Sequence, residues 1–183
     1  MKIENYDKKT LFIILIVLII GIISFILFMF SDSMRFKREY GVSFNNRFVY
    51  TDISSVLESD FTGVVFFCDK DNSWCSSYAK LLDSASKKSD VKKLYYVPIG
   101  DVSTSSDLYK KLIKLLTGTL HLDENGKEVL HVPYTLYLKD GKVKYYDSET
   151  SLTISGDTPD KYWTDAEKKD FFNKFNEFIK GVY

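Results

Sequence analysis

A run of twenty apolar residues, 11–30, constrains this chain more than any other feature of its sequence. The run LFIILIVLIIGIISFILFMF contains no charged residue, and only Gly21 and Ser24 interrupt it. A helix of this length is about 30 Å long, which matches the hydrocarbon thickness of a bilayer. A helix of a soluble core would carry a polar face over five turns. The sequence therefore predicts one transmembrane helix, preceded by a short tail over residues 1–10.

A cleaved signal peptide is the alternative interpretation of this run, but residues 28–33 (FMFSDS) offer no small-residue cleavage pattern. Three basic residues precede the run and three follow it, so the positive-inside rule does not fix the orientation. They are Lys2, Lys8 and Lys9 before the run, and Arg35, Lys37 and Arg38 after it. A short head before a large domain is typical of an uncleaved signal-anchor. We expect a single-pass protein of the cytoplasmic membrane with its domain on the extracellular side.

The composition of the chain is that of a folded protein. The whole sequence has 25 Lys+Arg, 25 Asp+Glu and 45% hydrophobic residues. No basic block is present, so a nucleic-acid partner is not expected. Residues 31–44 are polar and charged, which suggests a tether. Residues 45–183 are then the domain, and a fragment that starts near Phe44 should fold without the anchor because the periodic apolar stripes lie within 45–181.

Strands and helices alternate in the expected domain. Strand patterns cover 48–50, 63–68, 94–99, 134–138 and 143–146, and helix patterns cover 52–58, 74–88, 108–116 and 164–180. Asp140-Gly141 predicts a tight hairpin, and Thr164 with Glu167 predicts a helix start. The stretch 156–163 is expected to be a long loop. This βαβαβα-ββα order predicts an α/β fold with a mixed central sheet flanked by helices on both faces.

Three features carry a resemblance to a known family: the buried strand Gly63 to Cys68, Trp74-Cys75 at a helix start, and Val132-Pro133 before a later strand. The chain resembles membrane-anchored thioredoxin-like proteins of Gram-positive bacteria, akin to bacteriocin-transport accessory proteins. The resemblance covers residues 45–181 and implies a thioredoxin-like fold in which Pro133 is in cis. A cis proline there would leave the main chain of Val132 free to pair with an extended substrate.

The family motif itself is degenerate in this sequence. When Asn72-Ser73-Trp74-Cys75 is aligned with the family's Cys-Pro-Trp-Cys, Asn72 occupies the position of the nucleophilic cysteine. Another register aligns Trp74-Cys75-Ser76-Ser77-Tyr78 with Trp-Cys-Gly-Pro-Cys. In this register Cys75 matches the first cysteine, and Tyr78 occupies the position of the resolving cysteine. We prefer the first register because it aligns the flanking residues without a gap. Neither register supplies a CxxC pair.

Thiol-disulfide exchange requires a thiolate, which the free N–H groups at a helix start stabilise. Asn72 would instead cap those groups, and Cys75 would be a small buried residue or a monothiol. Cys68 and Cys75 lie seven residues apart, which permits a disulfide, but two free buried thiols are expected.

Two functions are consistent with these sequence features. The first is an accessory module without cofactor or dithiol catalysis. Its groove of Asn72, Trp74, Val132 and Pro133 would bind an extended peptide or a membrane-protein partner. The alternative is a thiol-disulfide oxidoreductase acting through Cys75, alone or with Cys68.

The sequence contains two histidines, His121 and His131, which are candidate metal ligands. Together with Cys68 and Cys75 they make four potential metal ligands, but their spacing matches no metal motif. His131 precedes Val132-Pro133, whose loop would face the helix that begins near Cys75. We expect no metal site, and a surface or strand-end position for His131.

Overall fold

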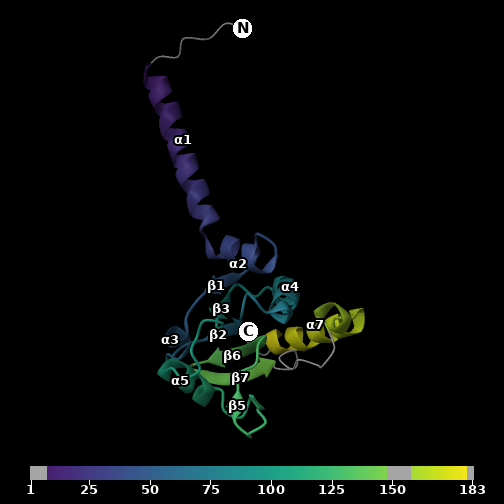
Figure 1. The fold of residues 1–183 in the computed structure, drawn as a ribbon. Helices are drawn as coiled ribbons and strands as arrows, with labels where there is room; N and C mark the ends of the chain where they lie inside the picture. Colours follow the sequence, from purple (N-terminus) through teal and green to yellow (C-terminus); the bar gives the residue numbers. More distant parts are fainter. Residues whose placement is uncertain (1–7, 148–157, 181–183) are drawn as a thin grey trace.

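A five-stranded mixed sheet forms the centre of the protein. The computed structural model describes residues 8–147 and 158–180 (Figure 1). The strands are β1 (Phe48–Tyr50), β2 (Gly63–Cys68), β3 (Leu94–Pro98), β6 (Tyr134–Lys139) and β7 (Lys142–Asp147), in the order β1-β3-β2-β6-β7. The first three are parallel, and β6 and β7 are antiparallel to their neighbours. A small hairpin, β4 (His121–Leu122) and β5 (Glu128–Val129), stands apart from this sheet.

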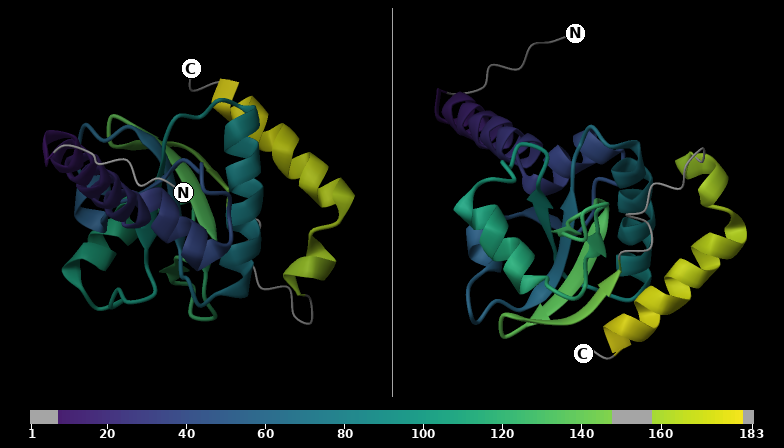
Figure 2. Two further views of the ribbon diagram at one scale, coloured as in Figure 1. Left: turned by 90° about the horizontal axis from the view of Figure 1, so that it is seen from above. Right: turned by 60° about the horizontal axis from the view of Figure 1, so that its bottom comes forward.

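Helices cover both faces of the sheet, as the sequence predicted (Figure 2). One face is covered by α2 (Asp32–Tyr40), α4 (Ser73–Lys88) and α7 (Asp165–Lys180), and the other by α3 (Ile53–Val56) and α5 (Asp107–Leu115). A short helix, α6 (Pro159–Tyr162), precedes α7. The expectation of a mixed α/β architecture is therefore confirmed.

The central strand β2 is buried on both sides. Val64 and Phe66 belong to the core beneath α2, α4 and α7, whereas Val65 and Phe67 belong to the core beneath α3 and α5. A strand covered on both faces needs a continuous apolar run, because successive side chains point to opposite faces. The sequence GVVFFC supplies it.

The apolar run forms α1 (Lys8–Met29), a helix that leaves the domain beside α2 (Figure 1). None of its residues is buried, and its length and composition are sufficient to cross a membrane. Its surface is apolar around the whole circumference, which suits a lipid environment rather than water.

The interpretation of residues 31–44 as a tether is wrong. Residues 32–40 form α2, which Ser31 caps at its start and Gly41, at φ 65°, ends in the left-handed conformation. Phe36 is fully buried, and the Tyr40 hydroxyl lies 2.6 Å from the Tyr96 hydroxyl. Phe36 and Tyr40, four residues apart, form one narrow apolar face that the surrounding charges obscure in the sequence.

The C-terminal half follows the expected elements closely. Asp140 (φ 50°) and Gly141 (φ 65°) form the tight turn of the β6–β7 hairpin. The Thr164 hydroxyl accepts a hydrogen bond from the Glu167 N–H at 3.3 Å, at the start of α7. The predicted loop 156–163 differs, because residues 159–162 form α6 and Trp163 is buried. Residues 156–157 of that prediction lie outside the described residues.

The position of Phe36 leads to a stability prediction. Phe36→Ala removes a fully buried ring, so we expect it to lower the free energy of unfolding by about 3–5 kcal/mol. Phe44→Ala is the matched control, because Phe44 is 60% exposed and its loss should change little.

Another prediction concerns α2 as a whole. Because Phe36 is part of the core, a fragment that starts at Phe44 should be far less stable than one that starts at Ser31. Urea denaturation followed by circular dichroism measures both comparisons, and equal stability of the two fragments would contradict the structural role of α2.

Candidate functional site

The sequence-predicted site lies where β2 ends and α4 begins. Cys68 is the last residue of β2, and a short turn leads to Ser73, the first residue of α4. In this turn, the Asp69 carboxylate accepts a hydrogen bond from the Asp71 N–H at 3.0 Å. The Asn72 N–H donates to the Asp69 carbonyl at 3.1 Å. These bonds fold the chain back so that the first turn of α4 faces the end of β2.

Cys68 and Cys75 form a disulfide, so the expectation of two free thiols is wrong. The turn brings their Cα atoms to 5.7 Å, within the range that a disulfide requires. Both residues are fully buried, and the Cys75 sulfur accepts a hydrogen bond from the Asp69 N–H at 3.2 Å. A buried bond of this kind is shielded from the thiolates and small reductants that would attack it.

Asn72 caps α4, as the sequence predicted. Its side-chain oxygen accepts hydrogen bonds from the N–H groups of Trp74, at 2.9 Å, and Cys75, at 3.4 Å. The same side chain donates through Nδ2 to the Val132 carbonyl at 3.5 Å. Asn72 therefore links the start of α4 to the segment before β6, and it uses the helix-terminal N–H groups that would otherwise stabilise a thiolate.

The peptide bond between Val132 and Pro133 is cis, as the family resemblance implied. Pro133 is buried, whereas Val132 is half-buried and packs against both apolar cores. The carbonyl of Val132 already accepts the bond from Asn72. The expectation that the Val132 main chain is entirely free is therefore wrong for its carbonyl group.

Trp74 contacts a residue that the sequence analysis did not identify. Its half-buried ring meets Tyr162 of α6 edge-on, with ring centroids 5.5 Å apart. Tyr162 in turn packs against Trp163, and Trp163 against Phe171 of α7. The adjacent aromatic residues Tyr162 and Trp163 in the predicted loop were the available signal, because loops rarely carry two large rings without burying one.

Tyr78, the residue at the resolving-cysteine position in the second register, is a core residue. It is 1% exposed, and its hydroxyl donates to the Asp147 carboxylate of β7 at 2.7 Å. Burial, followed by the negative charge of Asp147, raises the pKa of Tyr78 well above its usual value. Tyr78 therefore stays a neutral hydrogen-bond donor that fixes α4 to the sheet.

The histidines do not complete a metal site with the cysteines. The rings of His121 and His131 lie 6.4 Å apart, and His131 is exposed. The two cysteine sulfurs are bonded to each other, so neither can act as a thiolate ligand. Within the ranges 8–147 and 158–180, no group of three or more His, Cys, Asp and Glu side chains is arranged to hold a metal ion.

No protein-family model matches the chain, and no curated protein shows significant similarity to it.

The disulfide leads to a second stability prediction. A cross-link over seven residues should stabilise the fold by about 2 kcal/mol, so the double variant Cys68→Ala, Cys75→Ala should lose about that amount in urea denaturation. Ser76→Ala, in the same turn of α4, is the control and should change little. Mass spectrometry after iodoacetamide treatment should detect no labelled cysteine in the native protein, and two after denaturation with reductant. Labelling of both cysteines in the native, unreduced protein would contradict a buried bond.

Proposed function

We propose that this protein is a membrane-anchored, thioredoxin-like module that binds a partner, and that its disulfide is structural rather than catalytic. The strand order β1-β3-β2-β6-β7, the antiparallel β6 and the cis Val132–Pro133 bond support the thioredoxin-like fold. Asn72 lies at the N-cap of α4, where the first register expects the nucleophilic cysteine.

The observation that carries this proposal is the full burial of both sulfur atoms together with the capping role of Asn72. A dithiol enzyme needs an accessible thiolate at the helix start. Here the N–H groups that would stabilise it are bonded to an amide oxygen. What stays available near this position is a recognition surface of half-buried side chains: Asn72, Trp74 and Val132, next to the buried Pro133.

An oxidoreductase that uses the Cys68–Cys75 pair is the second candidate, because the two cysteines are bonded and Cys75 lies in the first turn of a helix. Reduction of an exposed disulfide substrate, measured with the thiols pre-reduced, separates the two candidates. We expect the wild type, Cys68→Ser and Cys75→Ser all to show only the background rate. Substantial turnover by the wild type that Cys75→Ser abolishes would overturn the binding-module proposal.

A gain-of-function variant tests whether Asn72 occupies the position of the missing nucleophile. Asn72→Cys combined with Cys68→Ser creates a CxxC pair with Cys75 and removes the competing bond. The N–H groups at the helix start should lower the pKa of the introduced thiol from about 8.5 toward about 7, which raises its thiolate fraction at neutral pH about fifteenfold. The wild type has no thiol at this position, so we expect the variant to exceed the wild-type background rate by about tenfold or more. Asn72→Ser with Cys68→Ser is the matched control, because serine also caps a helix but carries no thiol. Equal activity of both variants would show that residue 72 is not the nucleophile position.

The location of the module is part of the same proposal. We infer that α1 spans the cytoplasmic membrane and that the domain lies on its extracellular side. Disulfides persist in oxidising compartments and are rare in the cytosol, so the Cys68–Cys75 bond supports export of the domain.

A protease added to intact protoplasts tests this orientation. Trypsin should digest the domain without lysis, and a cytosolic marker protein should stay intact as the control. Protection of the domain until the membrane is lysed would reverse the proposed orientation.

A further inference from the structure

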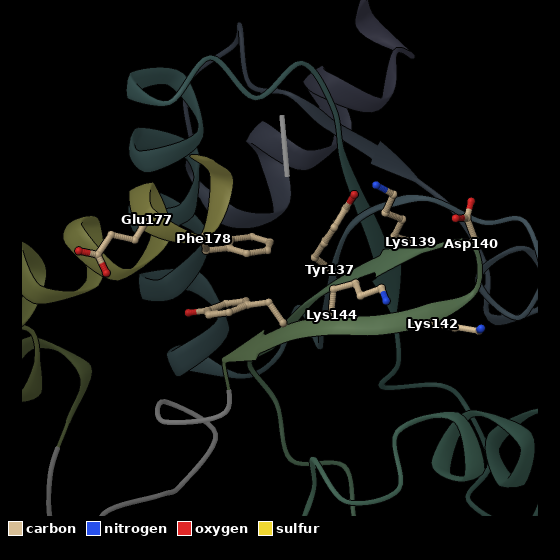
Figure 3. Close-up of a pocket in the computed structure, with 8 residues that line it drawn as sticks. Tyr137, Lys139, Asp140, Lys142, Lys144, Glu177 and Phe178 are labelled. Atoms are coloured by element: carbon tan, nitrogen blue, oxygen red, sulfur yellow. The ribbon is translucent and has the colours of Figure 1, made fainter. Parts of the chain in front are cut away.

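A groove of about 610 Å³ lies between the β6–β7 hairpin and the end of α7. Three lysines, Lys139, Lys142 and Lys144, border it, together with the rings of Tyr137 and Phe178 (Figure 3). Tyr145 also lines it. The hairpin turn lies beside the start of β2, since Gly63 pairs with Leu138, whereas Cys68 is the last residue of β2. The groove is therefore at the opposite end of the sheet from the disulfide.

An irregularity in β7 places the third lysine in this groove. Tyr137 pairs with Tyr145 and Leu138 pairs with Val143, which leaves Lys144 as the extra residue of a β-bulge. In a regular strand, Lys144 and Tyr145 would point to opposite faces of the sheet. The bulge instead allows both to line the same groove, and bulges often reorient a side chain in this way.

Three lysines and two acidic residues line the groove. Lys139, Lys142 and Lys144 are exposed, and none of them forms an ion pair with any residue of the described ranges. Asp140 and Glu177 also line the groove but make no ion pair with them within those ranges. Among the residues that the structure describes, the groove thus presents three ammonium groups without an ion-pair partner, beside two carboxylates.

The basic surface continues into a second groove of about 390 Å³, which shares Tyr137 and Lys139 with the first. There, Lys93 lies over the ring of Tyr95 at 5.4 Å. Lysines on an edge strand also prevent pairing with other sheets, which accounts for Lys142 and Lys144. That role does not account for Lys93 and Lys139, because Lys93 precedes β3 and Lys139 ends β6, and neither strand is at the edge of the sheet.

The aromatic side chains between the lysines add an apolar contact surface. Tyr145 stacks on Phe178 with ring centroids 4.1 Å apart, and Phe178 is only 8% exposed. Tyr145 itself is half-buried, so part of its surface is accessible to a ligand. An apolar side chain can pack there while neighbouring anionic groups approach the lysines.

We propose that this lysine groove binds an extended acidic segment of a partner protein, with its carboxylates at Lys139, Lys142 and Lys144 and an apolar side chain against Tyr145. The two grooves share lining residues, which favours an elongated ligand. The three lysines have no ion-pair partner in the described part of the chain, which favours an anionic one. The groove is on the β7 side of the sheet, whereas α1 joins the domain through α2, which packs on β1 at the other edge (Figure 1). A membrane that holds α1 is therefore remote from the groove, which favours a protein segment over lipid headgroups. This inference does not depend on the proposed role of the Cys75 end.

A binding assay on the full chain in nonionic detergent micelles tests the proposal. The probe is a fluorescein-labelled peptide of glutamates interrupted by leucine and phenylalanine, and binding is followed by fluorescence anisotropy. Reversing two charges with Lys142→Glu, Lys144→Glu should weaken binding by about tenfold or more. Lys111→Glu, Lys114→Glu on α5 is the matched control, because both lysines are exposed, line neither groove and form no ion pair within the described residues. The net charge changes equally in the two double variants. It should leave binding within about twofold of wild type.

Added salt should weaken the binding, and the same peptide with glutamine in place of glutamate should not bind detectably. If the two double variants lost equal amounts of binding affinity, the effect would be one of net charge alone and the proposal would be overturned. It would also be overturned if the glutamine peptide bound as tightly as the original. Phosphatidylglycerol vesicles, polyphosphate and the unlabelled peptide should be compared as competitors at equal concentrations of negative charge. If the vesicles or polyphosphate displaced the labelled peptide more effectively than the unlabelled peptide does, the groove would be assigned to another anion. Matching urea midpoints for the variants and the wild type would establish that the substitutions leave the fold intact.

Discussion

Burial of β2 on both of its faces is the constraint on which the rest of the structure depends. Val64 to Cys68 are each at most 2% exposed, and they divide the apolar residues into two separate cores. Because β2 pairs with β3 on one side and β6 on the other, it also holds the parallel and antiparallel parts of the sheet together. Each core then needs its own layer of helices, since an uncovered face would expose a row of aromatic and branched side chains to water.

The same strand determines the character of the candidate site, because its last residue is half of the disulfide. Cys68 lies at the end of the most buried strand, so Cys75 must enter the core to reach it. Asn72 then stabilises the helix start, and its bond to the Val132 carbonyl joins the helix to the segment before β6. A cross-link, a helix cap and a side-chain bond thus act on one short region. This arrangement favours a fixed recognition surface over a reactive thiol that must alternate between two states.

Most of the fold could be predicted from the sequence because each of these elements has a strong local signal. The continuous run of β2, the Asp140-Gly141 turn and the Thr164 cap each allow one local structure, and all three were predicted. The helix α2 was missed because only Phe36 and Tyr40 face the core, and charged residues surround both in the sequence.

The site was predicted less completely, because the contacts that decide it are not local in the sequence. Asn72 as a helix cap was predictable from its neighbours, whereas its bond to Val132 joins residues sixty positions apart. The disulfide depended on the exact path of a short turn, which residue spacing permits but does not determine. The contact of Tyr162 with Trp74 depends on α6, a helix of four residues that follows a stretch without a clear periodic pattern.

The two ends of the sheet differ in chemistry in a way that suits two separate contacts. The end that holds Cys68 and Pro133 carries the disulfide, the Asn72 cap and the contacting rings of Trp74 and Tyr162. The other end carries exposed lysines and a bulged edge strand. These surfaces share no residue, so a ligand at one end would not displace a ligand at the other, and their binding free energies should add. For a domain joined to an apolar helix at the β1 edge, the β7 edge is the side most accessible from solution. A recognition surface is most effective there, because a partner can approach it without meeting the membrane that α1 is suited to span.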